Sequence, residues 1–329
     1  MSLPDVIEIV PTESAVHAEI SVPGSKSITN RALILAALAG ATTILDGALW
    51  SEDTQVMVEA LQRMGFCITV EPDANEYCNR KITVQGLGGK IPDGGTAEKP
   101  LELFVGNAGT AARFLAAFVC LGRGVYRLHG SPRMHERPQA ALFESLRQLG
   151  YRVDSANNQL PADIYGAGRR EGTCTVSMEE SSQFASALLL CAKVGGWKIE
   201  VSGESFEEAP YVVMTQRLIE SFPPRYGRFQ IEADASSASY FCAANWLLRW
   251  QHRERIEKRI LSGYQKTHAL SELYNRLDPI RVAAFPKSKW QIDAAFPDFL
   301  PLPGAENQNP IPSRKVHRLH KWKTRQTPT

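Results

Sequence analysis

Apolar residues along this chain gather in runs that follow short polar starts, and this pattern recurs at four places. Each run mixes alanine with large apolar residues, and the four segments are residues 24–38, 107–118, 181–190 and 234–244. Alanine and leucine favour helix, while Ser, Asn or Asp at a start can cap the first free backbone N–H groups. Because apolar residues occupy nearly every helical face, the pattern predicts four buried helices. The repeated start chemistry favours copies of one unit over four unrelated core helices.

Two further patterns alternate with these helices. Short β-like runs bounded by turn residues predict strands at residues 81–84, 174–176 and 198–201. Amphipathic helices are predicted over residues 54–64 and 139–149, and each ends at a glycine, Gly65 or Gly150. Strands and helices therefore alternate along the chain, which predicts the α/β class.

The composition narrows the class of protein. Of the 329 residues, 43% are apolar, which is enough for a large core and more than one domain. No apolar run is long enough to span a bilayer and the first residues lack a signal-peptide core, so we expect a cytoplasmic protein without a membrane partner. The six cysteines lie far apart without the paired spacing of metal sites, which predicts free, buried thiols and no bound metal.

Charge is distributed unevenly along the chain. Residues 251–329 hold 15 Lys and Arg against 7 Asp and Glu, whereas residues 1–250 hold 22 against 28. This split indicates either a basic tail on a globular body or two segments with different histories. A basic tail can bind nucleic acid, but the chain has no recognisable nucleic-acid motif, so we expect no nucleic-acid partner.

Residues 23–31 form a glycine- and hydroxyl-rich helix entry with two cations, Lys26 and Arg31, and a hydroxyl at Ser27. A helix N-terminus offers unpaired N–H groups and a positive dipole end, which suit a phosphate or carboxylate. The spacing of a Walker A loop is absent. A capped helix with surface cations explains this segment equally well.

Other helix entries and one proline-bounded segment repeat this chemistry. A second entry has Gly109, where a ligand can approach the backbone, although a simple turn into the helix explains that glycine better. Between prolines, Arg133 and Arg137 can clamp an oxyanion, and a surface ion pair with Glu136 is the alternative. A third entry supplies neutral donors, Ser181, Ser182 and Gln183, and Tyr211 adds a phenol. Together these signals predict a cleft for two phosphorylated, carboxylated ligands.

These segments resemble, in order, the signatures of the EPSP synthase family. The matching stretches are residues 23–31, 106–113, 132–138, 181–184 and 234–240, and the resemblance covers roughly residues 8–248. The sister family of UDP-N-acetylglucosamine enolpyruvyl transferases shares the fold but lacks the signatures at 132–138 and 181–183. The resemblance implies a two-domain, inside-out α/β barrel of repeated βαβαββ units with an incomplete second domain. It also implies a monomer that needs no cofactor.

The resemblance implies four regions along the chain. Residues 1–22 would supply a strand to the domain formed by the C-terminal half, residues 23–233 a complete enolpyruvyl transferase domain, residues 234–303 a partial second domain, and residues 304–329 a basic, disordered tail. The implied reaction transfers an enolpyruvyl group from phosphoenolpyruvate to the 5-hydroxyl of shikimate 3-phosphate, a step in the formation of chorismate and aromatic amino acids.

The family's binding residues carry over position by position. By this resemblance Lys26 would be catalytic and would contact both substrates. Shikimate 3-phosphate would also be bound by Ser27, Arg31, Ser181, Ser182, Gln183 and Tyr211. Phosphoenolpyruvate would also be bound by Gly109, Arg133 and Gln183. Glyphosate inhibits the family at the phosphoenolpyruvate position, and Phe114 stands where many relatives have proline.

The resemblance fails after Leu248 and returns only over residues 291–303. The family's later carboxylates, arginines and lysine have no counterpart in this sequence, as a truncated or frameshifted gene would explain. The alternative to an active transferase is therefore a catalytically inert relic that retains the shikimate 3-phosphate half-site.

Overall fold

The computed structural model describes residues 6, 8, 16–74, 76–202, 209–223, 226–261 and 279–300. Three of the predicted alanine-rich helices lie at its centre: α1 (Lys26–Leu38), α3 (Gly109–Val119) and α6 (Ser182–Gly195). They pack against one another, and most of their residues are buried. Apolar side chains on all faces of a helix require neighbours on all faces, which explains their central position.

The strands form small sheets outside these helices. The first sheet has the order β11-β2-β4-β3 and contains β2 (Thr42–Leu49), β3 (Ile68–Pro72), β4 (Asn79–Gln85) and β11 (Gly227–Gln230). The second has the order β5-β6-β8-β7 and contains β5 (Leu101–Phe104), β6 (Arg123–His129), β7 (Arg152–Asp154) and β8 (Ala162–Ala167). In each, one outer strand is parallel to its neighbour and the other pairs are antiparallel. A parallel pair joins β9 (Gly172–Ser177) to β10 (Trp197–Ser202).

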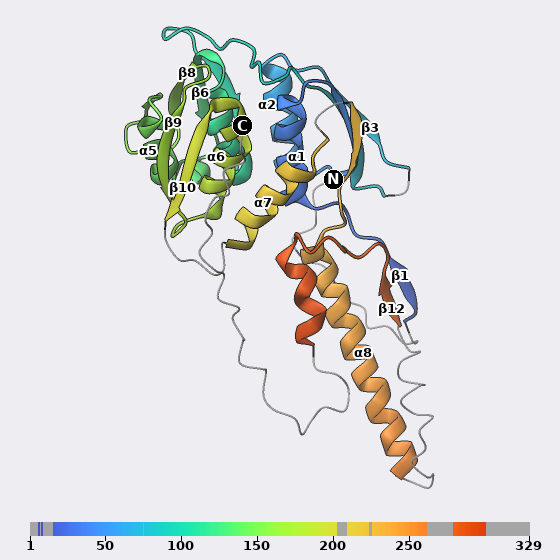
Figure 1. Cartoon of the computed structure of the whole chain (residues 1–329). Helices are drawn as coiled ribbons and strands as arrows, with labels where there is room; N and C mark the ends of the chain where they lie inside the picture. The colour runs from blue at the N-terminus through green and yellow to red at the C-terminus, as the bar shows by residue number, and fades with distance from the viewer. Residues whose placement is uncertain are drawn as a thin grey trace, which may run out of the picture.

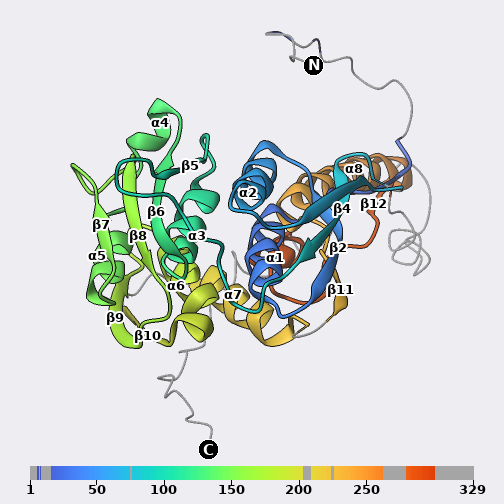
Figure 2. The ribbon, with the colours of Figure 1, turned by 90° about the horizontal axis from the view of Figure 1, so that it is seen from above.

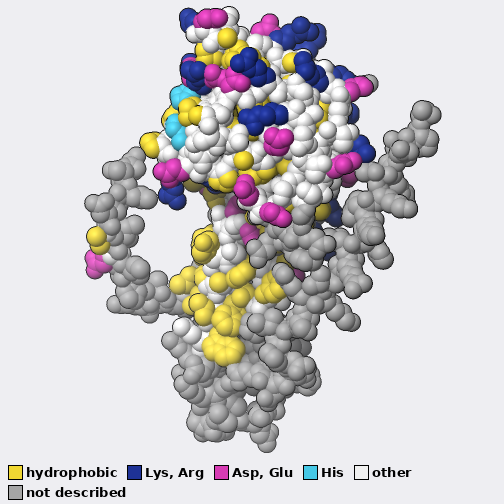
Figure 3. Space-filling view, turned by 90° about the vertical axis from the view of Figure 1, so that its left-hand side faces the viewer, with side chains coloured by type: hydrophobic (Ala, Val, Ile, Leu, Met, Phe, Trp, Pro, Cys, Tyr) yellow, Lys and Arg dark blue, Asp and Glu magenta, His cyan; other side chains and the backbone are white. Residues whose placement is uncertain are grey.

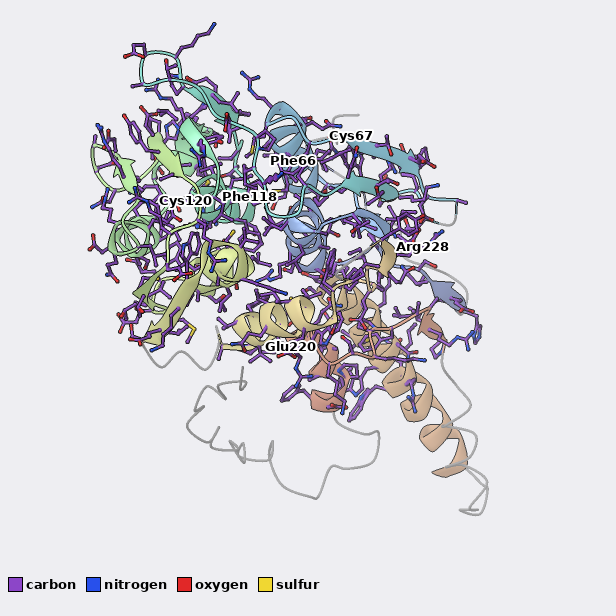
Figure 4. All side chains as sticks on the ribbon, turned by 45° about the horizontal axis from the view of Figure 1, so that its top comes forward. Phe66, Cys67, Phe118, Cys120, Glu220 and Arg228 are labelled. Atoms are coloured by element: carbon purple, nitrogen blue, oxygen red, sulfur yellow. The ribbon has the colours of Figure 1, made fainter. Side chains whose placement is uncertain are left out.

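These elements gather into two lobes (Figures 1 and 2). One lobe holds the first sheet with α1 and α2 (Glu52–Arg63); the other holds the second sheet and the β9–β10 pair with α3, α4 (Pro132–His135), α5 (Ala140–Gln148) and α6. Helix α7 (Ala209–Ser221) packs against both α1 and α6. Phe66, which follows α2, packs on Phe118 of α3 with ring centroids 5.7 Å apart (Figure 4). The lobes therefore share one apolar core.

Several local predictions are confirmed. Helices α2 and α5 end within two residues of Gly65 and Gly150, whose φ angles of +102° and +82° suit glycine alone. The strands predicted at 81–84, 174–176 and 198–201 lie inside β4, β9 and β10. The α/β class is likewise confirmed by this order of elements.

The last described part of the chain lies below the lobes. Strand β1 (Ala18–Ile20) pairs in parallel with β12 (Ile280–Val282), and η1 (Ile292–Phe299), a 3₁₀ helix, packs on α8 (Ala235–Leu261). The prediction that α8 is buried like the other three helices is wrong, since Tyr240 is 77% exposed and Leu247 53%. Described elements cover only part of its circumference, and Figure 3 shows hydrophobic side chains gathered on this lower part of the molecule. The predicted tail, residues 304–329, lies outside the described residues.

The cysteines are all free, as predicted, but they are not all buried. Cys120, Cys174 and Cys191 are buried in the core, whereas Cys67 and Cys78 are exposed (Figure 4 labels Cys67 and Cys120). Cys67 precedes the edge strand β3 and Cys78 lies in the turn that follows it, where little covers a side chain. Over the described ranges there is no group of three metal-ligating side chains and no helix long and apolar enough to cross a membrane.

Candidate functional site

The first turns of α1, α3 and α6 open onto one cavity of about 500 Å³. Its lining residues come from these turns, from the start of α2, from the segment after α4 and from α7: Lys26, Ser27, Arg31, Asp53, Asn107, Gly109, Thr110, Arg137, Ser181, Ser182, Gln183 and Tyr211. The first N–H groups of a helix lack partners inside the helix, and its dipole places positive potential there. Three such helix ends therefore favour an anion in this cavity.

Lys26, the first residue of α1, lies at the α2 side of the cavity. Its Nζ is 3.1 Å from Asp53 Oδ2, and the two side chains are 50% and 28% exposed. Asp53 is in the first turn of α2, where an acidic side chain complements the helix dipole. This pair places an ammonium group and a carboxylate at the cavity wall.

Arg31 lies one turn further along α1 and is only 2% exposed. Its Nε donates to Thr215 Oγ1 (2.7 Å), its Nη1 to the carbonyl of Ser27 (2.9 Å) and its Nη2 to Ser186 Oγ (3.2 Å). The guanidinium also lies 5.2 Å from the ring centroid of Phe114. Burial lowers the pKa of Arg31 to about 10, and the nearby Tyr211 opposes this shift. Within the described part of the chain no carboxylate pairs with Arg31, so its charge stays available to a ligand.

The α3 side of the cavity brings two more guanidinium groups to Gly109. A Cβ atom at Gly109 would lie 2.4 Å from Arg113 Nη1 and 2.5 Å from Arg137 Nη1, so a larger residue there would displace the two guanidinium groups. Arg137 Nη1 donates to the carbonyl of Asn107 (3.2 Å). Burial, and then the charge of Arg137, lower the pKa of Arg113 to about 10.

The α6 side contributes neutral donors. Ser181 caps the helix, because its Oγ accepts a hydrogen bond from the backbone N–H of Gln183 at 3.2 Å. Ser182 is 1% exposed, and Gln183 is half-buried at the same turn. Helix α7 brings Tyr211 to the cavity, and the carbonyl of Tyr211 accepts a hydrogen bond from Thr215 Oγ1 (2.8 Å). The Thr215 hydroxyl, which accepts a hydrogen bond from Arg31, is thereby fixed to the backbone of its own helix, α7.

The charge balance of the lining is positive. Among the described lining residues, Lys26, Arg31 and Arg137 face a single carboxylate, Asp53. Phosphate and carboxylate oxygens are the natural partners of such a set of guanidinium, ammonium, hydroxyl and amide donors. The arrangement can therefore bind one or more oxyanions and can place the Lys26 ammonium beside them.

The structure brings together all but one of the residues nominated from the sequence. Lys26, Ser27, Arg31, Gly109, Ser181, Ser182, Gln183 and Tyr211 line the same cavity. Arg133 does not line it: its side chain is exposed on α4, and the arginine of that segment that reaches the cavity is Arg137.

Sequence reasoning did not nominate Asp53, Asn107 or Thr110 for the site. Asn107 and Thr110 lie in a segment that was already prominent as a helix entry, so their polar side chains were a usable signal. Asp53 carried no signal of its own, because an acidic residue in a first helical turn is common for electrostatic reasons alone.

Comparisons with known proteins show which family the chain resembles. A family model described as EPSP synthase (3-phosphoshikimate 1-carboxyvinyltransferase) matches residues 10–251. The 3-phosphoshikimate 1-carboxyvinyltransferase of Opitutus terrae is 39% identical over 265 residues, which cover 74% of this chain and 59% of that protein. The protein of the same description from Trichormus variabilis is 40% identical over 262 residues, covering 73% and 59%. For the Vibrio cholerae protein the figures are 40% over 252 residues, covering 70% and 57%.

The chain thus spans less than three fifths of the length of these curated relatives. Among solved structures, an EPSP synthase from Acinetobacter baumannii is similar with a TM-score of 0.56 and 20% sequence identity. That match covers 72% of this chain and 55% of the other, and it indicates a shared fold.

Proposed function

The chain belongs to the EPSP synthase family, and on that premise we propose that its cavity binds shikimate 3-phosphate for enolpyruvyl transfer from phosphoenolpyruvate. The activity proposed is that of a 3-phosphoshikimate 1-carboxyvinyltransferase. The observation that carries the proposal is the meeting of three helix N-termini and three cations at one cavity. A phosphate group alone carries a charge of about −1.5 to −2 at pH 7, which this positive lining suits.

The proposed roles follow the sides of the cavity. Ser181, Ser182 and Gln183 at the start of α6 offer donors to the phosphate of shikimate 3-phosphate. Arg31, whose guanidinium no described carboxylate neutralises, offers charge to the substrate's other polar groups, together with Ser27 and Tyr211.

Phosphoenolpyruvate is assigned to the side formed by α3. Lys26, Gly109 and Gln183 border that side, and we place Arg137 there instead of Arg133 because only Arg137 lines the cavity. In the proposed reaction the 5-hydroxyl loses its proton and adds to the enol carbon while a proton adds to the methylene carbon. Phosphate then leaves as the new methyl group loses a proton and the double bond re-forms. Lys26 is the catalytic residue of this proposal, because its ammonium group can match negative charge as it shifts.

The proposal includes the fold-level organisation of the family. Each central helix packs on its own strands: α1 on β2 and β4, α3 on β6 and β8, α6 on β9 and β10. This recurrence supports three copies of a βαβαββ unit in an inside-out α/β barrel that spans residues 23–233. The pairing of β1 with β12 supports assigning residues 1–22 to a partial second domain with residues 234–303.

A calorimetric titration tests the proposal against its alternative, the inert relic. Shikimate 3-phosphate is titrated with and without phosphoenolpyruvate, and phosphate release is then measured at steady state. A transferase binds the two substrates cooperatively and releases phosphate, whereas the relic binds shikimate 3-phosphate alone and releases none. Shikimate without its phosphate is the control ligand and is expected to bind more weakly. Equal binding of shikimate and shikimate 3-phosphate, or no binding of either, contradicts the proposal.

A further inference from the structure

Arg113 stands directly behind the cavity without lining it. It belongs to α3, is 2% exposed, and has no carboxylate partner among the residues that the structure describes. Its Nε atom is buried and finds no hydrogen-bond partner among the described residues. Burying a charged group without an opposite charge costs free energy. This cost indicates that a contact made by the guanidinium of Arg113 has a function.

The hydrogen bonds of Arg113 lead to one lining residue. Its Nη1 donates to Gln183 Oε1 at 3.3 Å, and its Nη2 donates to the carbonyl of Pro138 at 3.0 Å. The guanidinium also lies 5.5 Å from the ring centroid of Phe184, the neighbour of Gln183. One contact therefore reaches the site, and the other two hold the guanidinium in place.

We infer that Arg113 is a positioning residue that turns the side-chain amide of Gln183 so that its NH₂ group faces the cavity as a donor to an anionic ligand. A guanidinium only donates hydrogen bonds, so it selects the oxygen of an amide and leaves the nitrogen at the far end. Gln183 borders the cavity, where that nitrogen meets the ligand. The inference rests on the proposed function, because the ligand is an oxyanion of the proposed substrates.

The chemistry of the neighbours makes this orientation necessary. Arg31, the other buried arginine, donates hydrogen bonds to the hydroxyls of Thr215 and Ser186. A hydroxyl can rotate either to donate or to accept. An amide cannot do this without a half turn that would aim its carbonyl oxygen at the anion. With a pKa of about 10, Arg113 keeps its proton at neutral pH and is not an acceptor there. Arg113 thereby prevents the one orientation of Gln183 that would repel an oxyanion.

A double-mutant cycle with inorganic phosphate as the probe tests this inference. Arg113→Met, Gln183→Met and the double variant are compared with the parent in ¹⁵N NMR titrations. Arg113→Met is expected to weaken phosphate binding about tenfold in the parent and less than about twofold in the Gln183→Met background. The Gln183 side-chain NH₂ resonances are expected to shift with phosphate in the parent and much less in Arg113→Met. Equal losses in both backgrounds overturn the inference, because the arginine then acts through its own charge or through the fold.

Further arms separate this result from the fate of the proposed function. Arg113→Leu, which also removes the donor, serves where Arg113→Met does not fold, as judged by thermal denaturation, and the same criterion applies to it. A parent that binds phosphate with the expected coupling but ignores shikimate 3-phosphate leaves the inference standing and overturns the proposed function. A parent that binds shikimate 3-phosphate, but loses phosphate affinity equally in both backgrounds, overturns the inference and leaves the proposed function standing. A parent that binds no phosphate overturns the inference, since the amide then serves no anion.

Discussion

Lys26 at the start of α1 forms an ion pair with Asp53 at the start of α2, with a Nζ–Oδ2 distance of 3.1 Å. Both residues border the anion cavity, and Asp53 is the only carboxylate among the described residues of its lining. The ion pair therefore divides the charge of Lys26 between a neighbouring helix and a ligand. Half-exposed ion pairs of this kind add little to the free energy of unfolding. We therefore expect the pair to affect mainly the affinity for an anionic ligand.

Replacing Asp53 by Asn is expected to strengthen phosphate binding. The change removes one negative charge from the lining and releases Lys26, and a unit charge several ångströms away changes binding roughly three- to tenfold at an intermediate dielectric constant. The thermal midpoint is expected to stay within a few degrees of the parent. Titration calorimetry measures the affinity. Weaker binding in Asp53→Asn would mean that the carboxylate is needed to hold Lys26 in place.

Arg31→Met is expected to abolish the binding of shikimate 3-phosphate while the fold is kept. The variant removes a buried guanidinium without an acidic partner, and Thr215 and Ser186 keep their mutual contact of 2.9 Å. Replacing buried charged groups by well-packed apolar side chains of similar volume is often neutral or stabilising. We expect affinity to fall by about a hundredfold or more, since charge-assisted hydrogen bonds are lost.

The control for Arg31→Met is Arg228→Met on β11, which removes an exposed arginine paired with Asp46 (Figure 4 labels Arg228). Arg228 lies outside the cavity lining, so its loss is expected to leave the affinity for shikimate 3-phosphate unchanged. Equal losses of affinity in the two variants would show a general effect of net charge instead of a site.

Gly109→Ala is expected to weaken anion binding by about tenfold or more, because the new methyl group displaces the guanidinium groups of Arg113 and Arg137. Gly40→Ala is the matched control, since nothing lies within 4 Å of a Cβ there and the change is expected to stabilise the protein by about 0.4–1 kcal/mol. Calorimetry and thermal denaturation measure both. Unchanged phosphate affinity in Gly109→Ala would argue against an anion beside these arginines.

The two buried arginines predict a pH dependence at the alkaline end. Burial lowers the pKa of Arg31 and Arg113 from the ordinary 12.5 to about 10, so both are charged at neutral pH and lose their protons as the pH passes 10. Phosphate affinity is expected to fall over that range. Between pH 10 and 12.5 the unfolded chain binds more protons at these groups than the folded one, so they make the free energy of unfolding rise with pH.

Titration of the Cζ resonances by ¹³C NMR reports these two groups directly. Arg152 is the internal control, because its hydrogen bond to exposed Asp154 raises its pKa. Its resonance is expected to stay constant while those of Arg31 and Arg113 move. Flat curves for all three arginines up to pH 11 would contradict the prediction.

The centre of the fold was predictable because its signal is local. Alanine-rich runs after polar starts predicted α1, α3 and α6, and Gly65 marked a helix end through its backbone alone. Burial of α8 was not predictable from the same pattern, since burial depends on what covers a helix and not on its own residues. The exposure of Cys67 likewise depends on its position beside an edge strand.

At the site, the types of residue were predictable from the sequence, but which side chains enter the cavity was not. Arg133 and Arg137 have the same chemistry and lie four residues apart, and only the coordinates distinguish the side chain that lines the cavity. Arg113 was visible in the same motif as Gly109, but its contact with Gln183 spans 70 positions of sequence and depends on how α3 packs on α6. Spacing along the chain carries no information about such a contact.

The parallel pairing of β1 with β12 has a consequence for biosynthesis. A ribosome releases the amino-terminal end first, so Ala18–Ile20 emerge early and find their hydrogen-bonding partners only once Ile280–Val282 have been translated. During that interval the nascent polypeptide presents a strand whose edges are unoccupied, a feature that invites misassociation. We therefore expect co-translational chaperones that shield exposed strands to bind the amino-terminal strand of this protein. That strand stays unpaired until well after the central helices have been synthesised.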